Sequence, residues 1–162
     1  MKRIFPFLIC LCFLTFACGE DPNDVTPLDA EVVFEVNLSG DYSSSFVQDS
    51  VSAFLHSSQI IVKGFDASDN TVTVLIDPSF FAAGAQVVGT HEIGRDSKPA
   101  RIVVGLADGS TFFISESGSL VVTDYSNNII KGTFSFEGTK NGDSSSTIAG
   151  TNGKFTAVVG EI

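Results

Sequence analysis

"IIKGTFSFEG", residues 129–138, is the stretch that decides the fold class of this chain. Ile130, Phe134 and Phe136 stand at alternate positions, and polar residues such as Thr133 and Ser135 stand between them. A period of two puts the apolar side chains on one face of a strand, whereas a helix would need a period of 3.6. The stretch therefore predicts a strand with one buried face and one exposed face.

The same signal recurs along most of the chain. Short runs rich in β-branched and aromatic residues alternate with Asp, Ser, Asn and Gly, which favour turns. We expect about ten strands, at residues 32–38, 50–56, 59–65, 71–77, 86–94, 101–107, 110–116, 119–125, 129–138 and 153–160.

Four polar segments separate these runs. "DASDN" (66–70), "DGS" (108–110) and "ESGS" (116–119) predict turns, and the last two would close hairpins. "TKNGDSSST" (139–147) predicts a polar loop.

One segment favours a helical turn. In "DPSFFAAG" (77–84), Asp77 can cap, Pro78 suits the first helical position and Gly84 can end the turn. No longer amphipathic helix is expected. The sequence therefore predicts an all-β domain, a single antiparallel β-sandwich or barrel with at most one short helical turn.

The N-terminus predicts export. Lys2 and Arg3 precede an apolar stretch, residues 4–17, which ends at a small residue. This is the pattern of a secretory signal, and the run is too short for a membrane-spanning helix of about 20 residues. We expect a lipoprotein signal peptide at 1–17, a polar tether at 18–29 and the antiparallel β domain at 30–162.

Cys18 follows the expected cleavage site and has two interpretations. A general signal peptidase could cut after "TFA" and leave a free thiol. Alternatively, "LTFAC" resembles a bacterial lipobox, although Leu14 stands at −4 rather than the usual −3. Cysteine suits this role because its sulfur takes a diacylglyceryl group as a thioether and its freed amine can take a further acyl chain. We favour lipidation of Cys18, so the expected partner is a membrane, held stably by two or more chains.

The residues after Cys18 suggest a cellular location. "GEDPND" (19–24) resembles the acidic stretch that follows the lipid cysteine in surface-displayed lipoproteins of the Bacteroidota. The resemblance implies that Glu20 and Asp21 act as an export signal. It also implies an outer-membrane lipoprotein that faces the cell surface, with the periplasmic face as the alternative. A solvated tether explains the same residues and is compatible with that role.

Three further segments resemble a family. "VTVLIDPSFFAAGAQVVG", "GSLVVTDYSNNIIKGTFSFEG" and "NGKFTAVV" are similar to small Bacteroidota lipoproteins of uncharacterised β-rich domain families. The resemblance implies a β-rich domain with no established activity. Its glycines suit turns or bulges and its phenylalanines suit core positions. The matching residues are Gly118, Asp124, Gly132, Thr133, Phe134, Phe136, Gly153 and Phe155.

The net negative charge of the chain argues against one class of partner, nucleic acid. The chain has 19 acidic and 9 basic residues, for a net charge of −10, and removal of Lys2 and Arg3 makes it more negative. Such a surface repels phosphate backbones, so we expect no nucleic-acid partner.

The sequence contains few residues at the spacing that a metal site needs. The two histidines, His56 and His91, stand far apart and have no partner at ligand spacing. Asp66, Asp69 and Asn70 lack the rest of a calcium loop, so a turn is the better interpretation. We expect no metal and no cofactor.

Catalytic patterns are also weak. The chain has no GxSxG, and its paired acids have no distinctive context. The densest polar patch is "HEIGRD" (91–96), with His91, Glu92, Arg95 and Asp96, which we interpret as an exposed loop with local ion pairs. We expect no enzyme.

Exposed aromatic rings are the remaining candidates for binding. Tyr42, Tyr125 and Phe81 could serve as platforms, as could one ring of the Phe112–Phe113 doublet, because adjacent rings on a strand face opposite sides. We therefore expect a lipid-anchored, non-enzymatic structural or interaction protein of the cell envelope. The alternative is a surface module that binds a glycan or a small apolar ligand, and whether a partner is protein, glycan or small molecule stays open.

Overall fold

The structure is a computed structural model, which describes residues 31–48, 51–81 and 86–161. The expected signal peptide and tether lie outside the described residues, and so do Cys18, Glu20 and Asp21. Their predicted roles stay predictions.

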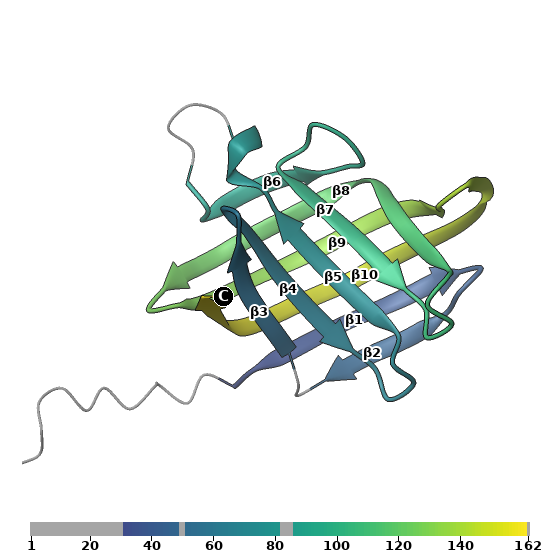
Figure 1. Cartoon of the computed structure of the whole chain (residues 1–162), viewed down its shortest axis with the longest axis horizontal. Helices are drawn as coiled ribbons and strands as arrows, with labels where there is room; N and C mark the ends of the chain where they lie inside the picture. The colour runs from purple at the N-terminus through teal and green to yellow at the C-terminus, as the bar shows by residue number, and fades with distance from the viewer. Residues whose placement is uncertain (1–30, 49–50, 82–85, 162) are drawn as a thin grey trace, which may run out of the picture.

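The described chain is almost entirely strand, as predicted (Figure 1). One 3₁₀ turn, η1, interrupts the strands at Pro78–Phe80. The strands are β1 (Val33–Gly40), β2 (Ser44–Gln48), β3 (Val51–His56), β4 (Gln59–Phe65), β5 (Thr71–Ile76), β6 (Gly89–Ile93), β7 (Ala100–Gly105), β8 (Phe112–Ser126), β9 (Ile129–Lys140) and β10 (Asp143–Glu161).

The strands form one sheet that closes on itself. Their order is β2-β1-β10-β3-β4-β5-β7-β6-β8-β9, and β9 pairs in addition with β10. The pairings are antiparallel except for β10 with β3 and a single residue pair between β6 and β7. The all-β sandwich or barrel is therefore confirmed, and closure removes most free edges.

The closed sheet is flattened into two layers (Figure 1). We call β3, β4, β5 and β7 the front layer, and β1, β8, β9 and β10 the back layer. β8 joins them, because its first residues pair with β7 and its later residues pair with β6 and β9. The end of β10 joins them again beside β3.

The predicted turn at 116–119 is wrong. β8 runs through it without a break, and a bulge between Ser115 and Ser117 changes its direction. At this bend the buried hydroxyl of Ser115 accepts the N–H of Ile102 at 2.9 Å, so β7 keeps a partner as β8 turns away. The polar residues that suggested a turn are those that a bulge needs.

Two other expectations need correction. The polar loop predicted at 139–147 is mostly strand, because β9 and β10 extend to Lys140 and Asp143. β2 was not expected, since its sequence "SSFVQ" shows no clear alternation, although Phe46 is buried. The turns at 66–70 and 108–110 are confirmed, and each joins two antiparallel strands.

The helical turn is confirmed. Asp77 caps η1 by accepting the Ser79 N–H at 2.9 Å, and Pro78 takes the first position. Its expected end at Gly84 lies outside the described residues.

The two layers fill one core with different side chains. The front layer supplies mainly aliphatic residues, such as Val74 and Ile102, whereas the back layer supplies phenylalanines. The ring of Phe134 lies 5.7 Å from that of Phe34 and 6.3 Å from that of Phe155, measured between centroids. Such tilted pairs are favourable aromatic contacts.

Glycines make room for these rings. Phe136 stands opposite Gly150, Phe134 opposite Gly153 and Phe155 opposite Gly132 in the β9–β10 ladder. A Cβ at any of these glycines would meet the facing ring. The predicted bulge role holds for Gly153, which adjoins a register shift, whereas Gly132 serves mainly by leaving space for Phe155.

Within the described ranges, no helix is long and apolar enough to cross a membrane.

Candidate functional site

The outer surface of the front layer is the most distinctive feature of the molecule. We call it the front face, and it consists of the side chains that point away from the core on β3, β4, β5, β7 and the start of β8. Its positions are Ser52, Phe54, His56, Gln59, Ile61, Lys63, Phe65, Thr71, Thr73, Leu75, Arg101, Val103, Gly105, Phe112 and Ile114.

Seven of the fifteen front-face positions hold large apolar side chains, which gather in two groups. Phe54, Ile61 and Leu75 stand side by side across β3, β4 and β5. Val103 and Ile114 form a second pair across β7 and β8. These five side chains are half-buried without packing against the core cluster, so they cover one another on the outside of the sheet. An apolar patch of this kind marks an interaction surface more often than a random surface feature.

The charges of the front face are all basic. Lys63 lies near its centre, with its Nζ 4.9 Å from the centroid of the Phe65 ring, and Arg101 lies on β7. No front-face position holds Asp or Glu, although the chain has 19 acidic residues. Asp96 borders the face at 3.9 Å from Arg101, and two further acids, Asp66 and Asp77, follow the ends of β4 and β5.

Asp66 and Asp77 are both engaged in local hydrogen bonds. Asp77 accepts from Ser79 and, at 2.6 Å, from the Gln59 amide, and these bonds lower the pKa of its carboxyl group. Asp77 lines a hollow of about 280 Å³ at one end of the front face, together with Leu75, Phe80 and Arg101.

Residues 66–70 form the turn predicted in preference to a calcium loop. One oxygen of Asp66 accepts the N–H groups of Ser68 and Asn70 at 2.8 and 2.9 Å, and the other accepts the Asn70 amide at 2.8 Å. Burial raises the pKa of Asp66, but these bonds and one from Tyr42 outweigh it and lower the pKa overall. The Asn70 oxygen in turn accepts the N–H of Ala107. The carboxylate therefore organises a turn. Across the described ranges no cluster of three His, Cys, Asp or Glu side chains could hold a metal.

A second hollow of about 530 Å³ adjoins Phe80 on its other side. Its lining includes His91, Glu92 and Ser97, the residue types that a nucleophilic enzyme would need. The geometry does not suit that chemistry. His91 is 6% exposed, its Nε2 lies 2.7 Å from the Val87 carbonyl oxygen, and its ring stacks on Phe81 at 4.5 Å. His56, at the end of β3, is exposed.

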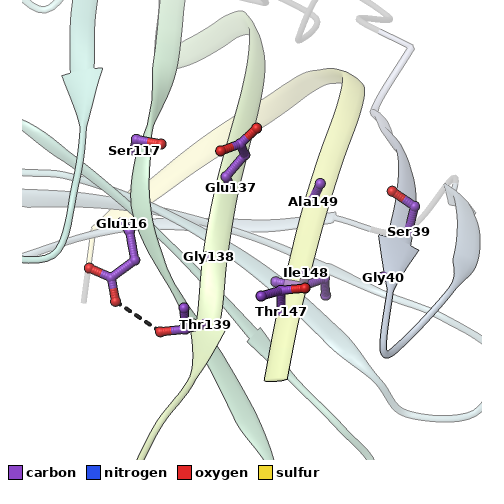
Figure 2. A pocket seen from close by; sticks show the side chains of 10 residues that line it. All are labelled: Ser39, Gly40, Glu116, Ser117, Glu137, Gly138, Thr139, Thr147, Ile148 and Ala149. Atoms are coloured by element: carbon purple, nitrogen blue, oxygen red, sulfur yellow. Dashed lines mark hydrogen bonds between the residues drawn. The ribbon is translucent and has the colours of Figure 1, made fainter. Parts of the chain in front are cut away.

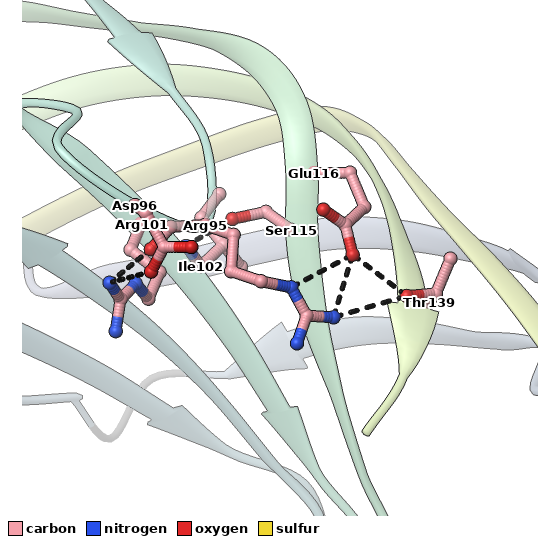
Figure 3. Close-up of polar contacts among 7 residues, drawn as sticks. All are labelled: Arg95, Asp96, Arg101, Ile102, Ser115, Glu116 and Thr139. Atoms are coloured by element: carbon pink, nitrogen blue, oxygen red, sulfur yellow. Dashed lines mark hydrogen bonds and ion pairs between the residues drawn. The ribbon is translucent and has the colours of Figure 1, made fainter. Parts of the chain in front are cut away.

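The polar patch at 91–96 forms local ion pairs, as predicted. Figure 3 shows those of Arg95 and Asp96. Glu92 bonds Lys98 at 2.6 Å, and Asp96 lies 3.9 Å from Arg101. Arg95 holds Glu116 through two nitrogens at 2.9 and 2.6 Å. The patch differs from the predicted exposed loop in two respects: its first residues belong to β6, and His91 is buried.

Figure 2 shows a third hollow, of about 390 Å³, over β8, β9 and β10. The carboxylates of Glu116 and Glu137 stand on neighbouring strands at its rim, and hydroxyls such as that of Thr139 line it. Hydrogen bonds from Arg95 and then from Thr139 lower the pKa of Glu116. A general acid for glycoside cleavage needs a raised pKa, so Glu116 does not suit that role.

The aromatic residues predicted as binding platforms fall into two groups, those that pack against the core and those that are exposed. Tyr42, Tyr125 and Phe81 pack against the core. Phe113 is 3% exposed and Phe112 is 37% exposed, so the two rings face opposite sides as expected.

Sequence reasoning missed most of the front face. The signal was present, because "QIIVKGF" (59–65) and "TVTVLID" (71–77) have apolar residues at both odd and even positions. Strands of that kind carry apolar side chains on both faces. Only the Phe112–Phe113 doublet was interpreted in this way.

Comparisons with protein-family models, with curated proteins and with solved structures give no match for this chain. Its function is therefore argued from its own residues.

Proposed function

We propose that this chain is a lipid-anchored, non-enzymatic interaction protein of the cell envelope. Lipid on Cys18 would hold it at the outer membrane, and Glu20 and Asp21 would direct it to the cell surface. The lipobox-like "LTFAC" and the acidic "GEDPND" support this location, as does the resemblance to β-rich Bacteroidota lipoproteins.

One observation carries the interaction role. The front face combines an apolar patch around Ile61 and Leu75 with Lys63 and Arg101, and none of its positions holds an acid in a chain with a net charge of −10. Exposed apolar surface has a cost in water, and it is commonly kept where a partner covers it.

The non-enzymatic role is supported by the state of the polar groups. The ring nitrogen of His91 is held by a backbone carbonyl, and Glu92, Arg95 and Glu116 are all engaged in ion pairs. None of these groups is poised for proton transfer.

Metabolic labelling with a fatty-acid analogue tests the anchor. The wild-type chain should take up label, and Cys18→Ser should take up none. Label that persists undiminished in Cys18→Ser would refute lipidation at this residue.

Protease shaving of intact cells tests the side of display. We expect digestion of the wild-type domain, and protection after Glu20 and Asp21 are both changed to Lys. A wild-type domain that survives on intact cells but is digested after lysis would place it on the periplasmic face.

A glycan-binding role is the second candidate, and the front-face rings of Phe54, Phe65 and Phe112 favour it. Sugar rings stack on aromatic surfaces, and Lys63 and Arg101 would suit an acidic sugar. An apolar small ligand is less favoured, because the core phenylalanines pack on one another. Affinity electrophoresis in gels with an acidic or a neutral polysaccharide tests this role. Retardation that Phe65→Ala removes would support it.

A further inference from the structure

We propose that the front face lies against an anionic bilayer surface when the chain is anchored, so that the domain rests on the membrane with the front layer down. This inference rests on the proposed lipid anchor at Cys18 and names the surface that the anchored domain contacts. Three independent features of the molecule lead to it.

Charge complementarity is the first. An acidic domain close to an anionic surface is repelled through any face that carries carboxylates. The outer surface of the back layer carries Glu35, Asp124 and Glu137, with Lys154 opposite Glu35 and Lys131 at 3.9 Å from Asp124. The front-face positions hold no carboxylate, and of their two cations Arg101 lies 3.9 Å from Asp96, whereas Lys63 forms no ion pair within the described ranges. The front face is therefore the side that an anionic surface attracts, and the attraction weakens with salt.

The same charges disfavour a second copy of the chain as the occupant. A two-fold interface places the same patch on both sides. It would bring the Lys63 of one copy toward that of the other, and no front-face position holds Asp or Glu to pair with it.

Chain length is the second feature. The segment from Cys18 to Glu31 spans no more than about 45 Å when fully extended. β1 begins at Val33, which pairs with Thr156 on the part of β10 that leads directly to β3. The anchor therefore joins the domain at β1 of the back layer, close to the place where the end of β10 pairs with β3 of the front layer. Such a short connection keeps the effective concentration of the surface in the millimolar range, so a weak contact suffices.

The chemistry of the side chains is the third. The Lys63 Nζ lies over the Phe65 ring, so its apolar stem and the ring share one patch near the centre of the front face. Ile61 lies on the same strand, Leu75 on the neighbouring β5 and Val103 on β7, one strand further on. Apolar side chains bordered by lysine and aromatic rings suit the boundary between headgroups and acyl chains.

Single-tryptophan variants of the full-length chain test the orientation, because the chain has no tryptophan of its own. Phe65→Trp places the reporter on the front face, and Val121→Trp places a matched, half-buried reporter on the outside of the back layer. Each lipidated variant is reconstituted into vesicles of phosphatidylethanolamine and phosphatidylglycerol, with or without lipids brominated near the headgroup.

Bromine should quench the Phe65→Trp emission about twofold, since interfacial side chains sit about 5–10 Å into the headgroup boundary. The Val121→Trp emission should not change. Adding Lys63→Glu to Phe65→Trp should remove most of the quenching, and so should replacing phosphatidylglycerol by phosphatidylcholine. Phe54→Trp is a second front-face reporter if Phe65→Trp fails to fold by circular dichroism.

Flotation of the same vesicles separates the two proposals. Protein that stays at the bottom of the gradient would contradict the anchor itself. Protein that floats, but whose front and back reporters are quenched equally or not at all, would overturn the orientation and leave the anchor standing. Front-face quenching that is unchanged by Lys63→Glu and by neutral lipid would overturn the electrostatic basis of the contact.

Discussion

The front and back layers share one core, yet they divide polar and apolar residues in opposite ways. The back layer fills its inner side with phenylalanines and glycines and keeps a mixed polar surface outside. The front layer fills its inner side with Val and Ile and keeps a second apolar surface outside. The back layer resembles an ordinary antiparallel sheet, which packs on the core with one face and contacts water with the other. The front layer has apolar side chains on both faces, as a sheet that is covered on both sides does.

This difference should separate effects on stability from effects on the proposed interaction. The rings around Phe134 hold the two layers together from within, while Ile61 and Leu75 contribute mainly to the outer surface. Changes inside the back layer should therefore affect unfolding most, and changes near the front face should affect it least.

The largest effect is expected for Phe134→Ala. Its ring contacts Phe34, Phe136 and Phe155, so its removal leaves a cavity and should lower the free energy of unfolding by about 3–5 kcal/mol. Urea denaturation measures this loss. Val74→Ala, on the inner side of the front layer, is the comparison and should cost less. A larger loss for Val74→Ala would contradict the view that the phenylalanines of the back layer contribute most to stability.

Gly150→Ala tests the glycines that face the rings. The new methyl group would overlap the Phe136 ring, so we expect a loss of about 1–3 kcal/mol in the free energy of unfolding. Gly160→Ala is the matched control on the same strand, because its nearest contact would be 3.8 Å away. Equal thermal unfolding midpoints for the two variants would show that the Phe136 ring does not require a glycine at position 150.

Ser115→Ala tests the bend that joins the layers. Its buried hydroxyl accepts the Ile102 N–H, and an N–H group left without a partner costs about 1–3 kcal/mol. Ser117→Ala, at the exposed end of the same bulge, should change stability by no more than about 0.5 kcal/mol. Amide hydrogen exchange should show faster exchange at Ile102 in Ser115→Ala, and unchanged protection there would argue against the bond.

The smallest effect is expected at the acids just beyond the front face, and it depends on pH. The pKa of Asp66 is lowered below its ordinary value of 3.8, so its ionised form is stabilised by folding. Its contribution, about 1 kcal/mol for such hydrogen bonds, is full above about pH 4 and is lost as the pH falls through the folded pKa. The stability difference between the wild type and Asp66→Asn should therefore be constant at neutral pH and shrink in acid. A difference that grows on acidification has the wrong sign for this mechanism.

Local patterns predicted the elements well, and the reason is local chemistry. The alternation in "TVTVLID", the Asp77 cap before Pro78 and the turn residues at 66–70 each act within a few residues, so the sequence alone identified β5, η1 and the β4–β5 connection. The bend in β8 was misread because a bulge and a tight turn use the same small polar residues, and only the partner strands distinguish them.

What the sequence by itself determined is the all-β class, the alternating faces of each strand and the opposite orientation of Phe112 and Phe113. Only the tertiary structure decided which strands are neighbours. The closure of β9 on β10, the pairing of each core ring with a glycine, and the gathering of Lys63, Ile61 and Val103 on one face all depend on register between distant segments. Register is set by long-range pairing and by bulges, and no local pattern encodes it.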